Sequence, residues 1–140
     1  MGGKKQTKLF IYSILSYSWS GENIMDWEAS IEEKHLIFKL SGSLDMEKIP
    51  SIMKEMLSRC EDQGKKKVLC DIRNLDISDM DTLDKVIIGK NVAEFFGMKL
   101  KIAAILPEDH KILVGDIIAR ERGGDLKGFF SKKEALKWLA

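Results

Sequence analysis

The sequence has little of what would point to a specialised chemistry. Its 140 residues include only two cysteines, Cys60 and Cys70. Neither stands near a second thiol or a histidine at the spacing of a metal site. We therefore expect two reduced, mostly buried thiols and a cytoplasmic setting, where such thiols persist. The sequence predicts no metal site and no cofactor.

Charge of one sign and long apolar runs are also lacking. The 23 basic and 22 acidic residues leave a formal net charge of +1, which gives no attraction to nucleic acid or to a membrane surface. The three lysines at 65–67 have no aromatic residues among them and are typical of a solvated loop. No run approaches the roughly 20 apolar residues that a membrane span needs. We predict no nucleic-acid partner and no transmembrane segment.

The first 24 residues stand apart from the rest. A short apolar stretch at 9–15 follows three lysines, but no small-residue cleavage motif comes after it, so a secretory signal is not favoured. A second methionine, Met25, precedes the first patterned segment. We expect residues 1–24 to be a flexible N-terminal extension or a mis-assigned start, and residues 25–140 to form the domain.

The domain opens with two strands and a helix. Apolar and polar residues alternate over 27–31 and 36–40, as in half-buried strands, with Glu33-Lys34 as the hairpin turn. Apolar residues then recur every three or four positions from Met46 to Cys60, which predicts a helix. This helix should begin near Ile49, because Pro50 cannot lie deep inside it, and should end at Gly64.

Short apolar runs then alternate with helical segments. The runs at 67–72 and 100–106 are apolar on both faces, as in buried parallel strands, and a weaker run at 126–130 fits an edge strand. Helices are expected over about 79–96, 109–122 and 132–139; Ser131 and Glu134 form a capping box for the last. The order β-β-α-β-α-β-α-β-α predicts a single α/β domain with a mixed sheet of four to five strands and about four helices.

An acidic loop follows the strand at 67–72. Four aspartates fall between Asp76 and Asp84, but a calcium loop needs glycine at its sixth position and glutamate at its twelfth. Counted from Asp79, those positions hold Asp84 and Lys90. We interpret the loop as a helix amino terminus, capped by Ser78 or Asp79; a contact loop for a protein partner is the alternative.

The helix that follows this loop has two apolar faces. At about 100° per residue, one side carries Met80, Leu83, Val86 and Ile87, and the opposite side carries Ile88, Val92, Phe95 and Phe96. One interpretation is a helix that bends near Gly89 and keeps one continuous core face. The other is a helix that buries two faces, the second against another protein or a second copy of the chain.

The two histidines do not predict an enzyme. His110, between Asp109 and Lys111, could act as a general base, but no nucleophile or oxyanion hole is visible beside it. A solvent-facing position in the first turn of a helix is the favoured interpretation. His35 begins a strand and is expected on the surface.

Several segments resemble a known family. Residues 68–75 followed by an acidic, serine-containing loop resemble the corresponding unit of STAS domains. Phe130 with Glu134-Ala135-Leu136-Lys137-Trp138-Leu139 resembles the carboxyl end of the SpoIIAA-like (STAS/SEC14-like) branch, and residues 101–105 fit its penultimate strand. The resemblance covers residues 26–140.

The resemblance implies a non-enzymatic regulatory module. STAS proteins such as anti-sigma factor antagonists bind a protein kinase partner and are switched by phosphorylation of a serine within Asp-Ser-Ser-Gly. The matching stretch here is Asp79-Met80-Asp81-Thr82, so Met80 holds the phosphoacceptor position and Ser78 and Thr82 only flank it. Partner binding without the usual phosphoacceptor is therefore expected, whether the partner is another protein or a second copy.

Two sets of candidate residues follow. The predicted partner-binding surface joins the acidic loop to one helix face and comprises Asp76, Ser78, Asp79, Asp81, Ile88, Val92, Phe95 and Phe96. The alternative function, implied by kinship with lipid-carrying folds, is a small-ligand or lipid-binding carrier or sensor. Its site would lie at the carboxyl ends of the parallel strands, where ligands of open α/β sheets gather, and would comprise Arg73, Asn74, His110 and Lys111.

Overall fold

A computed structural model describes residues 24–107, 120 and 122–140. Five strands form one sheet in the order β1-β2-β3-β4-β5; β1 is antiparallel to β2 and every other neighbouring pair is parallel. This arrangement confirms the single α/β domain with a mixed sheet. The strands are β1 (Asp26–Ile31), β2 (Leu36–Ser43), β3 (Lys67–Asp76), β4 (Lys101–Ile105) and β5 (Leu126–Phe129).

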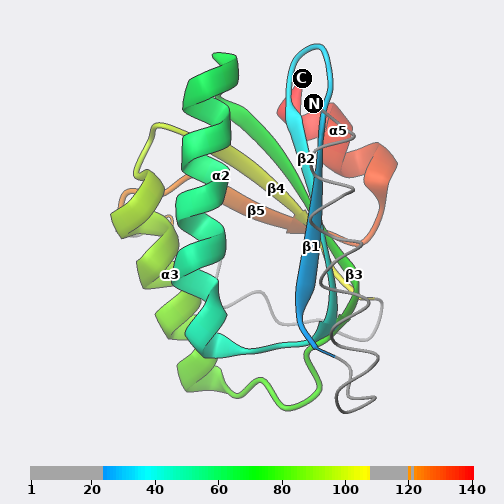
Figure 1. The fold of residues 1–140 in the computed structure, drawn as a ribbon, viewed down its shortest axis with the longest axis vertical. Helices are drawn as coiled ribbons and strands as arrows, with labels where there is room; N and C mark the ends of the chain where they lie inside the picture. Colours follow the sequence, from blue (N-terminus) through cyan, green and yellow to red (C-terminus); the bar gives the residue numbers. More distant parts are fainter. Residues whose placement is uncertain (1–23, 108–119, 121) are drawn as a thin grey trace.

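Helices cover both faces of this sheet. Figure 1 shows α2 (Ile49–Gln63) and α3 (Thr82–Phe96) on one face and α5 (Lys132–Leu139) on the other. A 3-10 turn, η1 (Met46–Lys48), leads into α2. These are the three α-helices of the described residues, whereas about four were expected; the helix expected over 109–122 lies almost wholly outside those residues. None of the described helices is long and apolar enough to cross a membrane.

Local sequence signals set most of the element ends. The helix α2 begins at Ile49, with Pro50 in its first turn, and ends at Gly64, whose φ of +64° is the left-handed conformation that glycine adopts readily. The last helix begins where the capping motif predicts, because the hydroxyl of Ser131 accepts a hydrogen bond from the backbone N–H of Glu134 at 3.1 Å. Pattern and capping chemistry therefore placed these helices correctly.

One glycine is required by a close approach of two chain segments. Gly42, near the end of β2, has a φ of +89°, and a Cβ there would stand 2.0 Å from the carbonyl oxygen of Ile24. Only glycine fits both the backbone angle and the contact. The contact lies where the chain enters β1, next to Met25, which is buried in the core.

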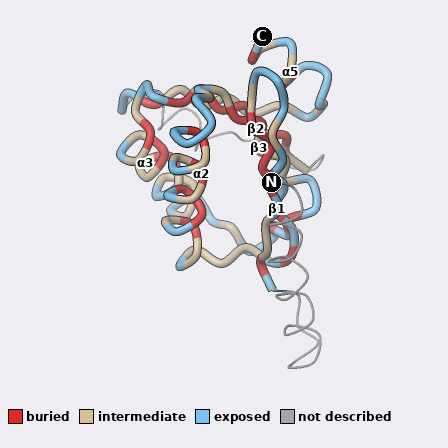
Figure 2. The backbone as a smooth tube through the Cα atoms, turned by 45° about the horizontal axis from the view of Figure 1, so that its top comes forward, coloured by how far each residue is buried: buried red, intermediate tan, exposed pale blue. Residues whose placement is uncertain are grey.

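The core has a layer on each side of the sheet, and Figure 2 shows the buried residues along the strands and the facing sides of the helices. The larger layer fills the space between the sheet and α2 and α3 and includes Phe38, Val68 and Ile102. The smaller one lies under α5 and comprises Ile37, Leu69, Ala103, Ile105, Ala135 and Leu139.

Candidate functional site

The acidic loop lies at the carboxyl edge of the parallel strands, between β3 and α3. Asp76, Ser78, Asp79 and Asp81 are exposed, while Ile77 between them is buried and belongs to the core. The loop is thus anchored by an apolar side chain and presents its polar side chains to solvent.

Hydrogen bonds order the start of the loop. The carboxylate of Asp76 accepts one hydrogen bond from the backbone N–H of Ser78 at 3.0 Å and another from its hydroxyl at 2.6 Å. These two bonds from Ser78 hold the pKa of Asp76 below its ordinary value. A turn follows, in which the N–H of Met80 donates to the carbonyl oxygen of Ile77 at 3.0 Å. The loop therefore has a defined shape and an ionised carboxylate at its start.

The cap of α3 is Asp81, so the expectation of Ser78 or Asp79 is wrong. The Asp81 carboxylate accepts from the N–H of Asp84 at 2.8 Å, and the Asp84 carboxylate accepts from the N–H of Asp81 at 3.3 Å. This reciprocal capping box starts the helix at Thr82, three residues later than expected. The turn that Met80 closes accounts for the delay, because it occupies residues that the sequence pattern assigned to the helix.

The helix α3 runs unbroken from Thr82 to Phe96, so it has no interruption at Gly89. Its two apolar faces have opposite surroundings. Val92 and Phe96 are 4% and 2% exposed and belong to the core, and Ile88 and Phe95 are partly buried against that core. The expectation that this face is available to a partner is thus wrong for Val92 and Phe96, because the sheet and α2 already cover them.

The other face of α3 is the one that reaches solvent. Leu83 is 64% exposed and Ile87 is 38% exposed, and both lie one or two turns from the acidic loop. Their exposure gives the first turns of α3 an apolar surface, and the acidic loop immediately precedes this helix in the chain. The sequence had grouped these two residues with the face opposite to the predicted interface.

The residues of the alternative ligand site are only partly described. Arg73 forms a two-pronged ion pair with Asp71, with Nε and Nη2 at 2.9 and 2.7 Å from its carboxylate oxygens. Burial alone would raise the pKa of Asp71, but the hydrogen bonds and charge of Arg73 outweigh it and lower that pKa. Asn74 is exposed. His110 and Lys111 lie outside the described residues, so the four-residue site stays a prediction.

The remaining polar candidates are His35 and the two cysteines. His35 lies at the amino-terminal end of the parallel strands, opposite to the end that carries the acidic loop. Its side chain is partly buried, whereas a surface position was expected. The Nε2 of His35 has no hydrogen-bond partner among the described residues. Both thiols are free. Burial raises the pKa of Cys60 to about 11 and that of Cys70 to about 12, so both are neutral at ordinary pH. No group of three metal-ligating side chains occurs in the described part of the chain.

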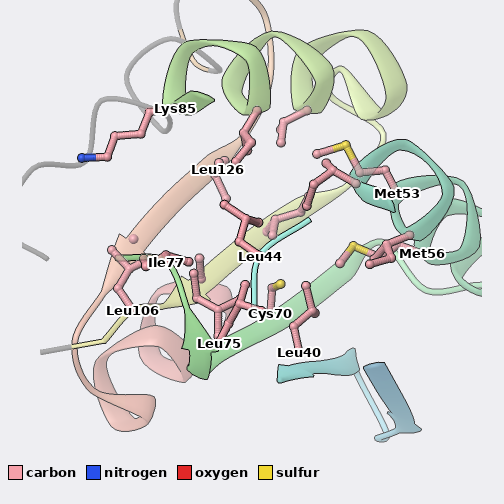
Figure 3. A pocket seen from close by; sticks show the side chains of 18 of the residues that line it. Leu40, Leu44, Met53, Met56, Cys70, Leu75, Ile77, Lys85, Leu106 and Leu126 are labelled. Atoms are coloured by element: carbon pink, nitrogen blue, oxygen red, sulfur yellow. The ribbon is translucent and has the colours of Figure 1, made fainter. Parts of the chain in front are cut away.

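Sequence reasoning missed an apolar cavity of about 170 Å³ between the sheet and the helices α2 and α3. Figure 3 shows side chains from the strands and both helices converging on it. Its sheet wall is a row of small residues, because the strand register aligns Cys70 with Ala104 and Ala104 with Gly128. Each small residue was visible in the sequence, but their alignment depends on pairing that a single strand does not reveal.

The comparisons with known proteins agree with this architecture. No protein-family model and no curated protein matches the sequence. Among solved structures, an anti-sigma factor antagonist from Mycobacterium paratuberculosis is similar, with 11% sequence identity and a TM-score of 0.57. The match covers 83% of this chain and 94% of the antagonist. A second similar structure is an uncharacterized protein of the DUF3478 family from Shewanella loihica PV-4 with a SpoIIAA-like fold. It is 26% identical to this chain, with a TM-score of 0.51, and the match covers 85% of this chain and 98% of that protein. The chain therefore has a STAS-like, SpoIIAA-like fold.

Proposed function

We propose that this domain is a non-enzymatic regulatory module that binds a protein partner through the loop at 76–81 and the first turns of α3. The observation that carries the proposal is the juxtaposition of exposed carboxylates with an exposed apolar patch. Asp79 and Asp81 supply negative charge, and Leu83 and Ile87 supply apolar surface. All four residues fall within the short segment 79–87. An apolar centre beside a charged rim is the usual composition of a protein interface.

The charge of the surface favours a basic partner. Asp76, Asp79, Asp81 and Asp84 place four carboxylates within nine residues. A symmetric dimer through this face would bring two such sets together, because a two-fold interface pairs the same patch with itself. Like charges in an interface are costly. A different protein with lysine or arginine beside an apolar pocket is therefore the favoured partner, and the homodimer becomes one outcome of the test.

The structure also supports a module without the usual phosphorylation switch. Met80, at the position that the family resemblance assigns to the phosphoacceptor, carries no hydroxyl and is partly buried against the core. The hydroxyl of Ser78 donates to Asp76 at 2.6 Å. A phosphate on Ser78 would replace that bond with repulsion from the neighbouring carboxylate.

Comparison with the similar structures supports the regulatory class. One similar fold is an anti-sigma factor antagonist, and this chain places its exposed loop at the carboxyl edge of the sheet, where functional loops of α/β domains gather. The described acids of the loop lie at the carboxyl ends of the parallel strands, and the described histidine, His35, lies at their amino ends. This separation favours docking over acid–base chemistry between them.

Site-specific photo-crosslinking in cells tests the proposal. A photoreactive residue at Leu83 should capture a defined protein, and the same residue at the exposed Ser58 of α2 is the matched control. Adding Asp79→Lys should abolish the crosslink from position 83, whereas Asp62→Lys, an exposed acid at the end of α2, should leave it intact. Equal capture from both positions, or capture that survives Asp79→Lys, would contradict the proposal. Capture of a second copy would replace the heterologous partner by a homodimer.

A further inference from the structure

The cavity between the sheet and the helices has walls of one chemical kind. Together with residues of the sheet, the cavity is lined by Met53 and Met56 of α2 and by Ile88 and Phe96 of α3. Apart from the thiol of Cys70, held neutral by burial, and one lysine, the described side chains that line it are apolar. Such a space has no polar groups to hold water and is suited to an apolar occupant.

The size of the cavity limits that occupant. Apolar cavities of about 150 Å³ stay dry and admit a molecule of the size of benzene. A cavity of about 170 Å³ therefore takes an apolar body of about six to eight carbon atoms. The row formed by Cys70, Ala104 and Gly128 keeps this space open, because larger side chains at these aligned positions would fill it.

One charged residue contributes to the described lining of the cavity. Lys85, in the first turn of α3, contributes to the lining, and Figure 3 shows its amine pointing away from the apolar cluster. A lysine buries its apolar stem and keeps its ammonium group in a wetter place. Lys85 is the sole charged side chain among the described residues of the lining. A ligand with an anionic end would meet this ammonium with its apolar end inside.

We infer that the cavity binds a small amphiphile, whose chain or ring of about six to eight carbons fills the space and whose carboxylate pairs with Lys85. This site is distinct from the docking surface and from the strand-end residues Arg73 and Asn74. Medium-chain carboxylates have this composition, and octanoate is the probe. The neutral alcohol 1-octanol has the same chain without the charge.

Methyl NMR of the protein with labelled methionine methyl groups locates the ligand directly. Octanoate should shift the signals of Met53 and Met56 in a saturable manner, while Met98, which is 74% exposed, serves as the internal control. Lys85→Met should weaken octanoate binding about fivefold, the size of a partly solvated ion pair, and should leave binding of 1-octanol unchanged. Lys90→Met, on the same helix but outside the lining, is the matched control.

A cavity-filling variant separates binding in the interior from binding on the surface. Ala104→Leu adds three carbons to the sheet wall and should abolish binding of both probes while keeping the fold, and Ala104→Val is the smaller substitution if Leu does not fit. Shifts confined to Met98, or an absence of saturation, would overturn the cavity assignment. Equal affinity for octanoate and 1-octanol, unaltered by Lys85→Met, would overturn the anionic ligand class. Neither result bears on crosslinking from Leu83, so failure of this inference and failure of the docking proposal are distinguishable.

Discussion

The two faces of α3 provide the sharpest test of the structure. Phe96 is 2% exposed and lines the cavity. Replacing a buried phenylalanine by alanine costs about 3–5 kcal/mol, because transfer free energy is lost and a void remains. At Phe96 the new void would join a cavity that is already present. We therefore expect the neighbouring side chains to fill little of the void by relaxing into it. We expect Phe96→Ala to lower the free energy of unfolding by about 4 kcal/mol, or roughly 10–20 °C in Tm.

The matched control lies on the opposite face of the same helix. Leu83 is 64% exposed, so Leu83→Ala removes few contacts and should change the free energy of unfolding by less than about 0.5 kcal/mol. Both substitutions end in alanine, the best helix former, so neither weakens the helix itself. The difference between the two variants therefore reports mainly burial, because even a fully buried leucine would cost about 2–5 kcal/mol when replaced by alanine.

Urea denaturation followed by circular dichroism measures both costs. The midpoint should fall strongly for Phe96→Ala and barely for Leu83→Ala. The slope should be unchanged in each variant, because the slope scales with the surface area that unfolding exposes and neither substitution alters that area much. Equal costs, or a larger cost at Leu83, would show that the helix is rotated from its described orientation. The proposed docking surface would then lose its apolar part.

Three further outcomes are expected. Gly42→Ala should lower the Tm sharply, since its Cβ would stand 2.0 Å from the oxygen of Ile24; an unchanged Tm would contradict the close approach. Asp81→Ala should cost about 1 kcal/mol and Asp79→Ala less than about 0.5 kcal/mol in urea titrations, and equal losses would disprove the cap assignment. Burial lowers the pKa of His35 below its ordinary value of 6.5, so the unfolded chain takes up the proton first. Stability should therefore fall as the pH drops below 6.5 and down to the folded-state pKa; a denaturation midpoint with the same pH dependence in His35→Gln would refute this.

Local sequence signals were sufficient for most elements of the fold. The helix at 132–139 follows from its capping serine and its apolar spacing, and the end of α2 follows from Gly64. The hairpin was predictable because apolar and polar residues alternate with period two. The expectation that both of its strands are half-buried is wrong for β2, because Phe38 belongs to the larger core layer and Ile37 to the smaller one, on the other face of the sheet. Each of these signals involves residues within a few positions of one another, so no tertiary information was needed.

The orientation of α3 could not be predicted in the same way. Its two stripes, one with Leu83 and Ile87 and the other with Val92 and Phe96, are both apolar, so the pattern gives no preference for either. The choice depends on which stripe meets the sheet and α2 after the loop has turned. The start of the helix was ambiguous for a related reason, because several residues before Thr82 can cap a helix and only the turn at Met80 selects among them.

Among the site residues, contacts within one strand could be predicted from the sequence and contacts across strands could not. The pairing of Arg73 with Asp71 was available from the sequence, because residues two apart in a strand share a face. The cavity was not, because Cys70, Ala104 and Gly128 come from three strands and are aligned only by the sheet register. Pattern analysis within single segments recovers neighbours along the chain and misses neighbours across strands.

The docking loop and the cavity share a segment, and this has a physical consequence for the two proposals. Ile77 and Met80 line the cavity, while Ser78 and Asp79 between them are exposed and belong to the proposed docking surface. A ligand that contacts the inner side chains can alter docking only if it binds the docked and free arrangements of the loop with different affinities. The partner must then change the affinity for the ligand by the same factor. Such coupling would let a ligand in the cavity regulate the docking of a partner at the loop.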